Sequence, residues 1–271
     1  MTRVLPAHVP DWAAIPAAEV ADAVALDPVV VLPLAATEQH GPHLPLSTDV
    51  DIGLGILSAA FDVLPADTPA WALSPFEVGA SEEHMSFLGT RSLSASEIVH
   101  AIERVGASLA EVGVRRLVLA NSHGGNRFAM EEAGLRLRRA HGMLVVKASW
   151  FRLGRPDGVD FPESEWRHGL HGGAVETAMM LHLRPDLVRV EQVAHFPSLG
   201  LELEGRLRRL GPEGEASFAW LAEDLNSAGV TGDARLATAE AGRRLVHHYG
   251  KALADVVRDA LDFPLDRLAS R

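Results

Sequence analysis

The sequence predicts an α/β protein with a mostly parallel sheet and helices on both of its faces. Short apolar runs of strand length alternate along the chain with amphipathic segments of helical period, and no segment repeats. Polar turns follow several of the apolar runs, and open parallel sheets bind ligands outside the carboxyl ends of their strands. With 271 residues and 47% hydrophobic content the chain can bury a large core, so we expect residues 1–271 to form a single domain.

The expected elements follow one another in a βαβα order. Strands are predicted at 29–36, 71–79, 116–120 and 143–150, and helices at 49–64, 94–113, 127–141, 173–183 and 234–261. Pro33 indicates a bulge or an edge in the first strand, because proline cannot donate to a sheet ladder. A Ser-x-x-Glu signal begins the second helix, and Gly142 closes the third. Residues 198–233 have turn signals but no period, so we expect an irregular excursion there, an oligomer contact or a lid.

Composition excludes several classes of protein. There is no cysteine, so neither a disulfide framework nor a thiolate metal site is possible. The 36 acidic and 25 basic residues give a formal charge of −11, which repels nucleic acid; the basic cluster Arg136–Arg139 is better explained as a solvated helix face. The N-terminus lacks a signal-peptide layout, and no apolar run is long enough to span a membrane. We therefore expect a soluble, cytoplasmic protein with neither a membrane nor a nucleic-acid partner.

The first cluster of polar residues is "TEQHGPHLPLSTDVD", directly after the first apolar run. Glu38 and His40 are two residues apart, so in an extended segment they point to the same side. The glycine and prolines that follow can turn the chain back, so that Asp49 rejoins the pair at a helix start. This combination suits a metal ion, and its alternative is a polar loop with an Asp cap. His43 and Asp51 are assigned to support or packing.

Two further clusters also follow predicted core elements. In "ANSHGGN", His123 comes after a strand, and Gly124 and Gly125 allow close backbone approach; the alternative is a tight strand-to-helix turn. A phosphate-binding loop is disfavoured because its glycine spacing is absent. In "HGGAVETAMML", His171 precedes a helix and Glu176 lies in its first turns, where a carboxylate can also simply complement the helix dipole. Three histidine-bearing turns together favour a metal site.

The same residues resemble a known family. The sequence is similar to the creatininase (creatinine amidohydrolase) family over about residues 29–245, on the motifs "E-x-H-G-x-H-L-P-x-x-T-D" (38–49), "N-x-H-G-G-N" (121–126) and "H-x-G-x-x-E-T" (171–177), with further likeness in "EHMSFLGT" (83–90) and "GVTGDARLATAEAG" (229–242). The resemblance implies a three-layer α/β/α fold and a dinuclear metal centre that hydrolyses an amide C–N bond. It also implies an assembly that is often a homohexamer.

Carried over residue by residue, the resemblance makes Glu38 and His40 ligands to different metal ions. Asp49 would bridge the two ions, and His123 would join the ion of Glu38. His171 matches the family's catalytic histidine, with a role in proton transfer. The two divalent ions would hold a bridging hydroxide and polarise the amide carbonyl. Oxygen and nitrogen ligands suit zinc, manganese or iron and do not choose among them.

One departure from the family pattern affects the expected substrate. Creatinine-hydrolysing members carry a tyrosine and a metal-binding glutamate where this chain has Gly124 and Gly125, so creatinine is not expected as substrate. Glu176 is the expected substitute ligand, and Ser81 and His84 fall in the family's substrate-contacting loop, or else in an exposed polar loop.

The sequence therefore predicts a metal-dependent amidohydrolase acting on a small amide, with cyclic and formyl amides among the candidates. Its "HGGN" form resembles the formamide deformylase and mycofactocin-peptidase branches of the family. The mycofactocin-type peptidase of the same family is one alternative function. A non-catalytic metal-binding scaffold is another, and a nucleotide-binding module is the least favoured.

Overall fold

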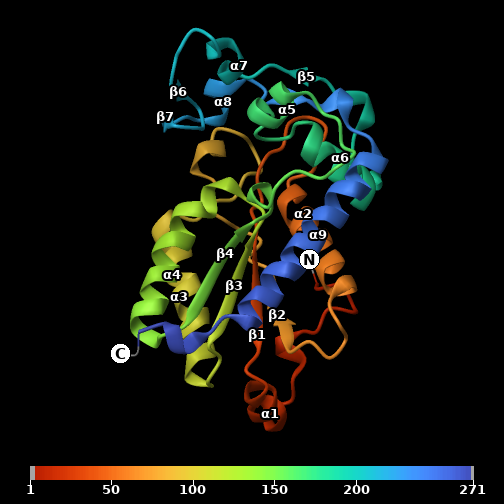
Figure 1. The fold of residues 1–271 in the computed structure, drawn as a ribbon. Helices are drawn as coiled ribbons and strands as arrows, with labels where there is room; N and C mark the ends of the chain where they lie inside the picture. Colours follow the sequence, from red (N-terminus) through yellow and green to blue (C-terminus); the bar gives the residue numbers. More distant parts are fainter. Residues whose placement is uncertain (1–3, 270–271) are drawn as a thin grey trace.

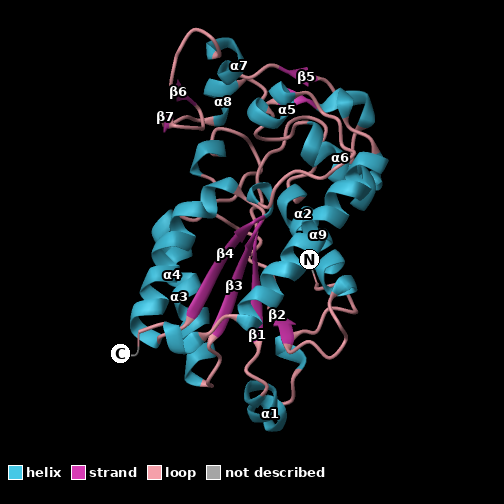
Figure 2. Cartoon of the chain, viewed as in Figure 1, coloured by secondary structure: helices cyan, strands magenta, loops and turns pink. Residues whose placement is uncertain are grey.

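The centre of the molecule is a parallel sheet of four strands. The computed structural model describes residues 4–269 and places the strands in the order β2-β1-β3-β4 (Figure 2). They are β1 (Val29–Leu34), β2 (Ala70–Ala72), β3 (Arg116–Asn121) and β4 (Leu144–Ser149). All of the strand pairs in this sheet are parallel, and β1 and β3 pair along their whole length. The carboxyl ends of β1 and β3 therefore lie side by side.

Helices cover both faces of this sheet. On one face lie α3 (Ala95–Glu111) and α4 (Arg127–His141), and on the other lie α2 (Thr48–Val63) and α9 (Ala239–Asp262), as Figure 1 shows. α6 (Ala174–Leu183) packs against α2 and α9 beyond the carboxyl ends of the strands. This arrangement is the three-layer α/β/α sandwich that the sequence and its family resemblance predict.

The side chains of β1 alternate between the two layers of helices. Val30 and Leu32 belong to the apolar cluster under α3 and α4, whereas Val29 and Val31 belong to the cluster under α2, α6 and α9. All of these side chains are fully buried, which explains why the strand has a continuous apolar sequence and no polar alternation. Burial on both faces fixes the register of β1, and with it the position of the residues that follow.

Local sequence signals set the ends of several helices. Ser94 and Glu97 form the reciprocal capping box that the sequence predicts for α3. Gly142 ends α4 with a φ of 70°, the left-handed conformation in which glycine has no steric penalty. The last helix begins at Ala239, five residues later than predicted, because Thr238 caps it after a short 3₁₀ turn over Ala234–Leu236.

The second strand is the main difference from the sequence prediction. The strand predicted at 71–79 is present but much shorter, because β2 ends at Ala72 and the chain then bonds to β1 only at Leu73 and Phe76. β1 is an interior strand, yet Pro33 is tolerated in it. The Val29 N–H and the Val31 carbonyl both form hydrogen bonds on the side of β2, and alternate residues of a strand face the same side. The Pro33 nitrogen therefore also faces that side, beyond the end of β2, where the missing N–H breaks no bond of the ladder.

Short elements occupy the expected irregular region and gather above the carboxyl ends of the strands (Figure 1). The sequence prediction missed α1 (Val20–Ala25) and α5 (Glu163–His168). The excursion contains β5 (His195–Phe196), α7 (Leu199–Leu203), β6 (Leu210–Gly211), β7 (Ala216–Ser217), α8 (Ala222–Leu225) and β8 (Gly232–Asp233). Over residues 4–269, none of the helices has the length and apolar content that crossing a membrane requires.

Candidate metal centre

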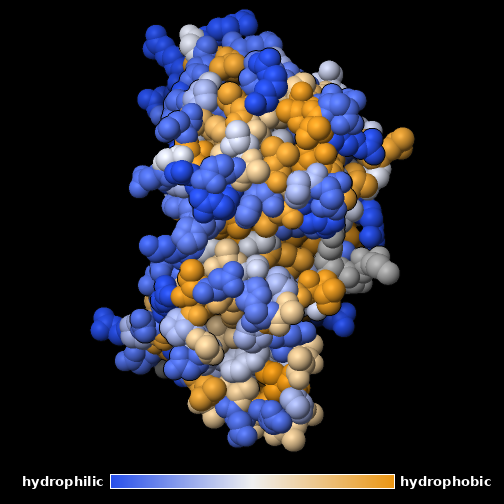
Figure 3. Space-filling model, turned by 90° about the vertical axis from the view of Figure 1, so that its right-hand side faces the viewer, coloured by the Kyte–Doolittle hydropathy of each residue, from blue (hydrophilic) through white to orange (hydrophobic). Residues whose placement is uncertain are grey.

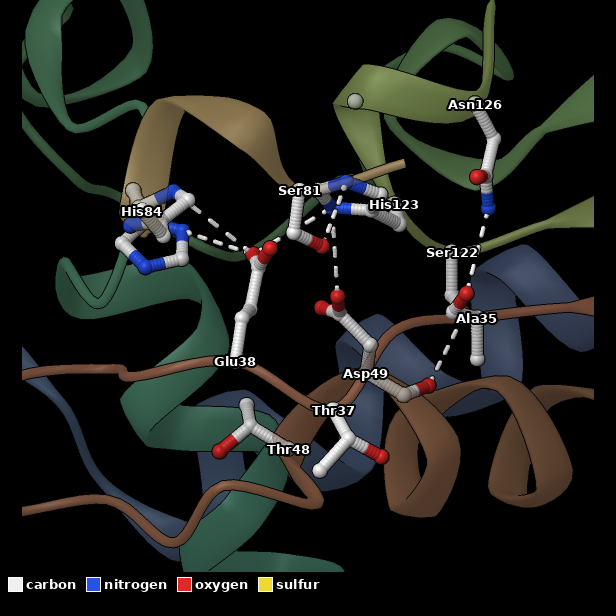
Figure 4. Close-up of polar contacts among 12 residues, drawn as sticks. Ala35, Thr37, Glu38, Thr48, Asp49, Ser81, His84, Ser122, His123 and Asn126 are labelled. Atoms are coloured by element: carbon white, nitrogen blue, oxygen red, sulfur yellow. Dashed lines mark hydrogen bonds and ion pairs between the residues drawn. The ribbon is translucent and has the colours of Figure 1, made fainter. Parts of the chain in front are cut away.

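The predicted polar residues meet where β1 and β3 end. Glu38 and His40 follow β1, His123 follows β3, and Asp49 lies in the first turn of α2. Figure 4 shows the carboxylates of Glu38 and Asp49 directed toward His123 from two sides. The turn through the prolines between His40 and Asp49 does return the chain to the strand end, as the sequence predicts. Glu176, in the first turn of α6, faces the same Nε2 of His40 that faces Asp49.

Asp49 stands between two imidazoles. Its Oδ1 lies 3.3 Å from His40 Nε2, and its Oδ2 lies 3.4 Å from His123 Nδ1. Glu38 Oε1 lies 3.2 Å from the same nitrogen of His123, and Glu176 Oε2 lies 3.9 Å from His40 Nε2. Oδ1 of Asp49 thus faces an imidazole nitrogen, of His40, that also faces Glu176. Oδ2 faces an imidazole nitrogen, of His123, that also faces Glu38.

The cluster is buried and its polar atoms are not satisfied by the protein alone. Glu38, His40 and Asp49 are 1%, 0% and 2% exposed, respectively. Both carboxylate oxygens of Glu38, the Nε2 of His40 and the Oδ2 of Asp49 are buried without a hydrogen-bond partner among the described residues. Leaving carboxylates in this state costs several kcal/mol per ion, so charges of this kind are normally paired or coordinate a metal. The residues present therefore fit a divalent cation.

Hydrogen bonds fix which nitrogen of each histidine faces the carboxylates. His40 Nδ1, His123 Nε2 and His171 Nε2 lie 3.1, 2.8 and 2.7 Å from the backbone carbonyls of Glu38, Ala80 and Gln39, respectively. A carbonyl only accepts, so in each ring that nitrogen donates, and the lone pair of a neutral ring is on the other nitrogen. In all three rings the other nitrogen faces a carboxylate oxygen. A lone pair on nitrogen and a carboxylate oxygen are both acceptors, so a cation or a proton must lie between them.

His84 has the opposite arrangement. The Gln39 side chain donates from Nε2 to the Gly229 carbonyl at 2.5 Å and accepts the Gly41 N–H on Oε1, which fixes the orientation of its amide. The same Nε2 lies 3.3 Å from His84 Nδ1, so this nitrogen accepts. Neutral His84 therefore carries its proton on Nε2, 3.7 Å from the carboxylate of Glu38.

The electrostatics of the cluster follow from burial and mutual contact. Burial opposes charge on Glu38, but His123, His84 and His171 outweigh it and hold the pKa of Glu38 well below its usual range. Burial also opposes charge on His40 and His123; the neighbouring carboxylates outweigh it, so that the pKa of His40 rises to about 9 and that of His123 well above its usual value. In the metal-free protein, protons on these rings compensate the charge that a cation would otherwise compensate.

The remaining titratable groups of the centre are shifted toward their neutral forms. Burial lowers the pKa of His171 well below its usual value, and the nearby His40 and His84 lower it further. Burial likewise lowers the pKa of His84 and raises the pKa of Glu176 to about 7. The ring of His171 lies between those of His40 and His84, with centroids 4.0 and 4.2 Å away. A neutral imidazole is thus held directly beside the charged cluster.

The structure also places the remaining residues that the sequence singled out. Ser81 and His84 are buried, so the exposed-loop interpretation is wrong; the Ser81 hydroxyl lies 3.3 Å from His123 Nε2, on the side of the ring away from Glu38. His43 contacts the Gly172 carbonyl and Thr177, and Asp51 pairs with Ser47 and Arg184. These partners agree with the assignment of His43 and Asp51 to support and packing.

Sequence reasoning missed Glu83. Its Oε1 lies 3.7 Å from His123 Nε2, and burial raises the pKa of its carboxyl. Three residue groups have ligand atoms close enough to share an ion: Glu38, His40 and His171; Glu38, Glu83 and His123; and His40, Asp49 and Glu176. The run "SEEH" (81–84) is a signal that could have identified Glu83, but nothing in the sequence shows which of its two glutamates turns inward.

Fold and site together define a class: an α/β/α protein with carboxylates and imidazoles clustered at its strand ends, as in metal-dependent hydrolases. Residues 13–257 match the model of the creatininase family, described as creatinine amidohydrolase. The chain therefore belongs to the creatininase family, and its curated relatives include a branch that is not named for creatinine.

Individual relatives extend this result. The chain is 35% identical over 224 residues, 80% of each chain, to the mycofactocin precursor peptide peptidase of Mycobacterium ulcerans. It is similar to the solved structure "Creatininase Mn", with 25% identity and a TM-score of 0.75 over 94% of this chain and 99% of that one. A mutant creatininase of the "Zn-Zn type" gives 25% identity and a TM-score of 0.73 over 93% and 98%.

Proposed function

We propose that this protein hydrolyses an amide C–N bond with two divalent metal ions. Glu38, Asp49 and His123 would hold the first ion, and His40, Asp49 and Glu176 the second. The observation that carries the proposal is the position of Asp49, whose two oxygens each face a different imidazole nitrogen. Both carboxylate oxygens of Glu38 and the Nε2 of His40 are also buried without a hydrogen-bond partner among the described residues, which supports the same assignment. Glu176 supplies the carboxylate that the glycine at position 125 cannot.

The ions would lower the pKa of a bound water and polarise the scissile carbonyl. Carboxylate and imidazole donors suit zinc, manganese or iron. The names of the solved relatives, which mention manganese and zinc, are consistent with this set.

His171 is the proposed proton-transfer residue. Its Nε2–H is held by the Gln39 carbonyl, and its Nδ1 lone pair lies 3.6 Å from Glu38 Oε1, facing the cluster. Because its pKa is well below the usual value, the ring is neutral at pH 7 and can accept a proton on Nδ1, then deliver it to the leaving nitrogen.

His84 would act differently from His171. Its Nε2–H points into the site, so it can donate a hydrogen bond to the carbonyl oxygen of a substrate. The Ser81 hydroxyl lies beside His123 Nε2, whereas the other nitrogen of that ring faces Glu38 and Asp49. Of the two residues predicted to contact substrate, His84 is therefore the one proposed to do so directly.

Two classes of substrate are candidates. The sequence favours a small amide, with cyclic and formyl amides among the candidates. The likeness to a mycofactocin precursor peptide peptidase favours a peptide bond as the second candidate. A panel of lactams, formamides, carbamoyl compounds and short peptides, assayed with zinc, manganese or iron, separates the two classes.

Metal analysis tests the proposal first. Purified protein supplemented with metal should hold about two divalent ions per chain, and Glu38→Ala should lose at least one of them. The Glu82→Gln variant, an exposed glutamate on the loop beside the site, is the matched control and should bind as wild type does. Wild-type protein with fewer than about one ion per chain would contradict the proposal.

The His171→Asn variant separates an enzyme from a metal-binding scaffold. Loss of a proton-transfer group should lower turnover by about 10²–10⁴-fold and leave metal content nearly unchanged. Equal, measurable activity of wild type and variant would show that His171 is not the proton-transfer residue. No activity of the wild type on every substrate of the panel would favour the scaffold.

We also propose a homo-oligomer, expected as a hexamer from the family resemblance. Large apolar side chains lie on the surface, among them Leu88, Phe128 and Val190, which are 98%, 74% and 65% exposed. Figure 3 shows apolar side chains gathered in the upper half of one face of the chain, which a subunit contact would cover. A sedimentation mass near that of one chain would contradict this expectation.

A further inference from the structure

The two glycines after His123 differ in what surrounds them. A Cβ built at Gly125 would overlap the carbonyl oxygen of Ala80 and would lie 2.6 Å from His123 Nε2 and 3.0 Å from Glu83 Oε1. A Cβ at Gly124 would meet no atom within 4 Å. Packing therefore requires glycine at position 125 and not at position 124. At Gly125 the loop that carries Glu83 lies directly against the turn after β3.

This close approach surrounds the outer nitrogen of His123. The ring donates from Nε2 to the Ala80 carbonyl at 2.8 Å, with the Ser81 hydroxyl at 3.3 Å and the Glu83 carboxylate at 3.7 Å. The same loop is fixed to the turn through the Ala80 N–H, which donates to Asn126 Oδ1 at 3.1 Å. These bonds join the loop of Glu83 to the turn after β3. His123 lies between the two, with Nδ1 facing Glu38 and Asp49, as Figure 4 shows.

We propose that Glu83 is a positioning residue for His123 and that Gly125 is the glycine that admits it. A carboxylate behind a ligand imidazole fixes the ring and its tautomer and makes the inner nitrogen a stronger donor to metal. Here the Ala80 carbonyl fixes the proton on Nε2, and the negative charge of Glu83 strengthens that polarisation from the same side. The inference rests on the proposed function, because it needs a cation at Nδ1.

A different role for the same carboxylate makes a different prediction. Glu38, Glu83 and His123 have ligand atoms close enough to share an ion, so Glu83 could instead bind metal directly. The geometry favours the positioning role, because Glu83 lies nearest the nitrogen that already donates to a carbonyl. Removal of a metal ligand lowers the number of ions that the protein binds. Removal of a carboxylate that only contacts a ligand leaves that number unchanged and lowers the affinity for the ion.

The test compares Glu83→Gln with Glu82→Gln, which changes the neighbouring exposed glutamate in the same way. Metal-free protein is titrated with Zn²⁺ against a competing chelator, and the Co²⁺-substituted protein gives a visible spectrum that reports ligand geometry. We expect Glu83→Gln to bind about 10–100-fold more weakly at unchanged stoichiometry, with a shifted Co²⁺ spectrum. Glu82→Gln should match wild type in both measurements.

Gly125→Ala and Gly124→Ala form a second matched pair. Gly125→Ala should displace the loop and weaken Zn²⁺ binding at least as much as Glu83→Gln does, whereas Gly124→Ala should change nothing. Combining Gly125→Ala with Glu83→Gln should add little, because both remove the same contact. Thermal unfolding of each metal-free variant shows whether the fold survives; the Glu83→Gln result stands even if Gly125→Ala does not fold.

The outcomes separate this inference from the proposed function. If wild type binds Zn²⁺ and Glu83→Gln binds it equally well with the same Co²⁺ spectrum, Glu83 does not position His123. If Glu83→Gln loses a whole equivalent of metal, Glu83 is a ligand and the positioning role is wrong. If wild type binds no divalent ion, the proposed function fails and the inference fails with it.

Discussion

Glu165 connects three parts of the molecule near the metal centre. It lies in α5, is only 5% exposed, and accepts the backbone N–H groups of Ala174 and Asp233, each at 2.7 Å. One of these is the first residue of α6, the helix that carries Glu176, and the other lies in β8. A Cβ at Gly173 would lie 2.5 Å from Glu165 Oε1, so glycine makes room for the carboxylate.

The cost of removing this carboxylate follows from the donors that it leaves. In Glu165→Ala, two backbone N–H groups lose their partner, and a buried unpaired donor costs about 1–3 kcal/mol. Ala174 is fully buried and Asp233 only half-buried, so the expected loss in the free energy of unfolding is about 2–4 kcal/mol. Glu165→Gln keeps one acceptor oxygen and should lose about half of that.

Urea unfolding at pH 7 measures the effect, with Glu163→Gln as control on the same helix. Glu163 pairs with Arg155 at 2.6 Å on the surface, where solvent screening leaves an ion pair little net effect on stability. If Glu165→Ala costs no more than Glu163→Gln, the buried carboxylate does not hold α6 to β8, and the reasoning is refuted.

Other predictions concern residues away from the metal centre. Burial opposes charge on Asp27, but Arg115 and Arg116 outweigh this effect and lower the pKa of its carboxyl. The stabilisation of the fold by this carboxylate is therefore present above the ordinary pKa of 3.8 and is lost as the pH falls through the lower pKa of the folded state. Asp27→Asn should therefore destabilise by about 1 kcal/mol or less at pH 7, and urea unfolding should show this difference shrinking below pH 3.8. Gly134→Ala, whose Cβ would make only ordinary contacts, should stabilise by about 0.5–1 kcal/mol, whereas Gly242→Ala would overlap a backbone carbonyl of α6 and should lower the melting temperature.

The positions of Glu38 and His123 could be predicted because they depend on sheet topology. Both follow buried parallel strands, and the two strands are neighbours in the sheet, so their ends meet. The end of the second strand could not be placed in the same way. β2 stops at Ala72, and the chain then bonds to β1 only at Leu73 and Phe76. The loop that follows is held through Ala80 to His123 and Asn126 in the turn after β3. Glu83 was missed for this reason.

The chemical role of each histidine depends on a partner that the sequence does not reveal. His40 and His171 are both anchored by backbone carbonyls, and a backbone carbonyl has no sequence signature. His84 is anchored instead by the amide of Gln39, whose own orientation is fixed by Gly229. One glutamine thus decides that His84 donates toward the site, while the carbonyl of the same residue decides that His171 presents a lone pair. Gln39→Glu would replace the donor to His84 with an acceptor and leave that carbonyl in place. We therefore expect this variant to reverse the tautomer of His84 and spare that of His171, which ¹⁵N NMR of the imidazole rings would detect.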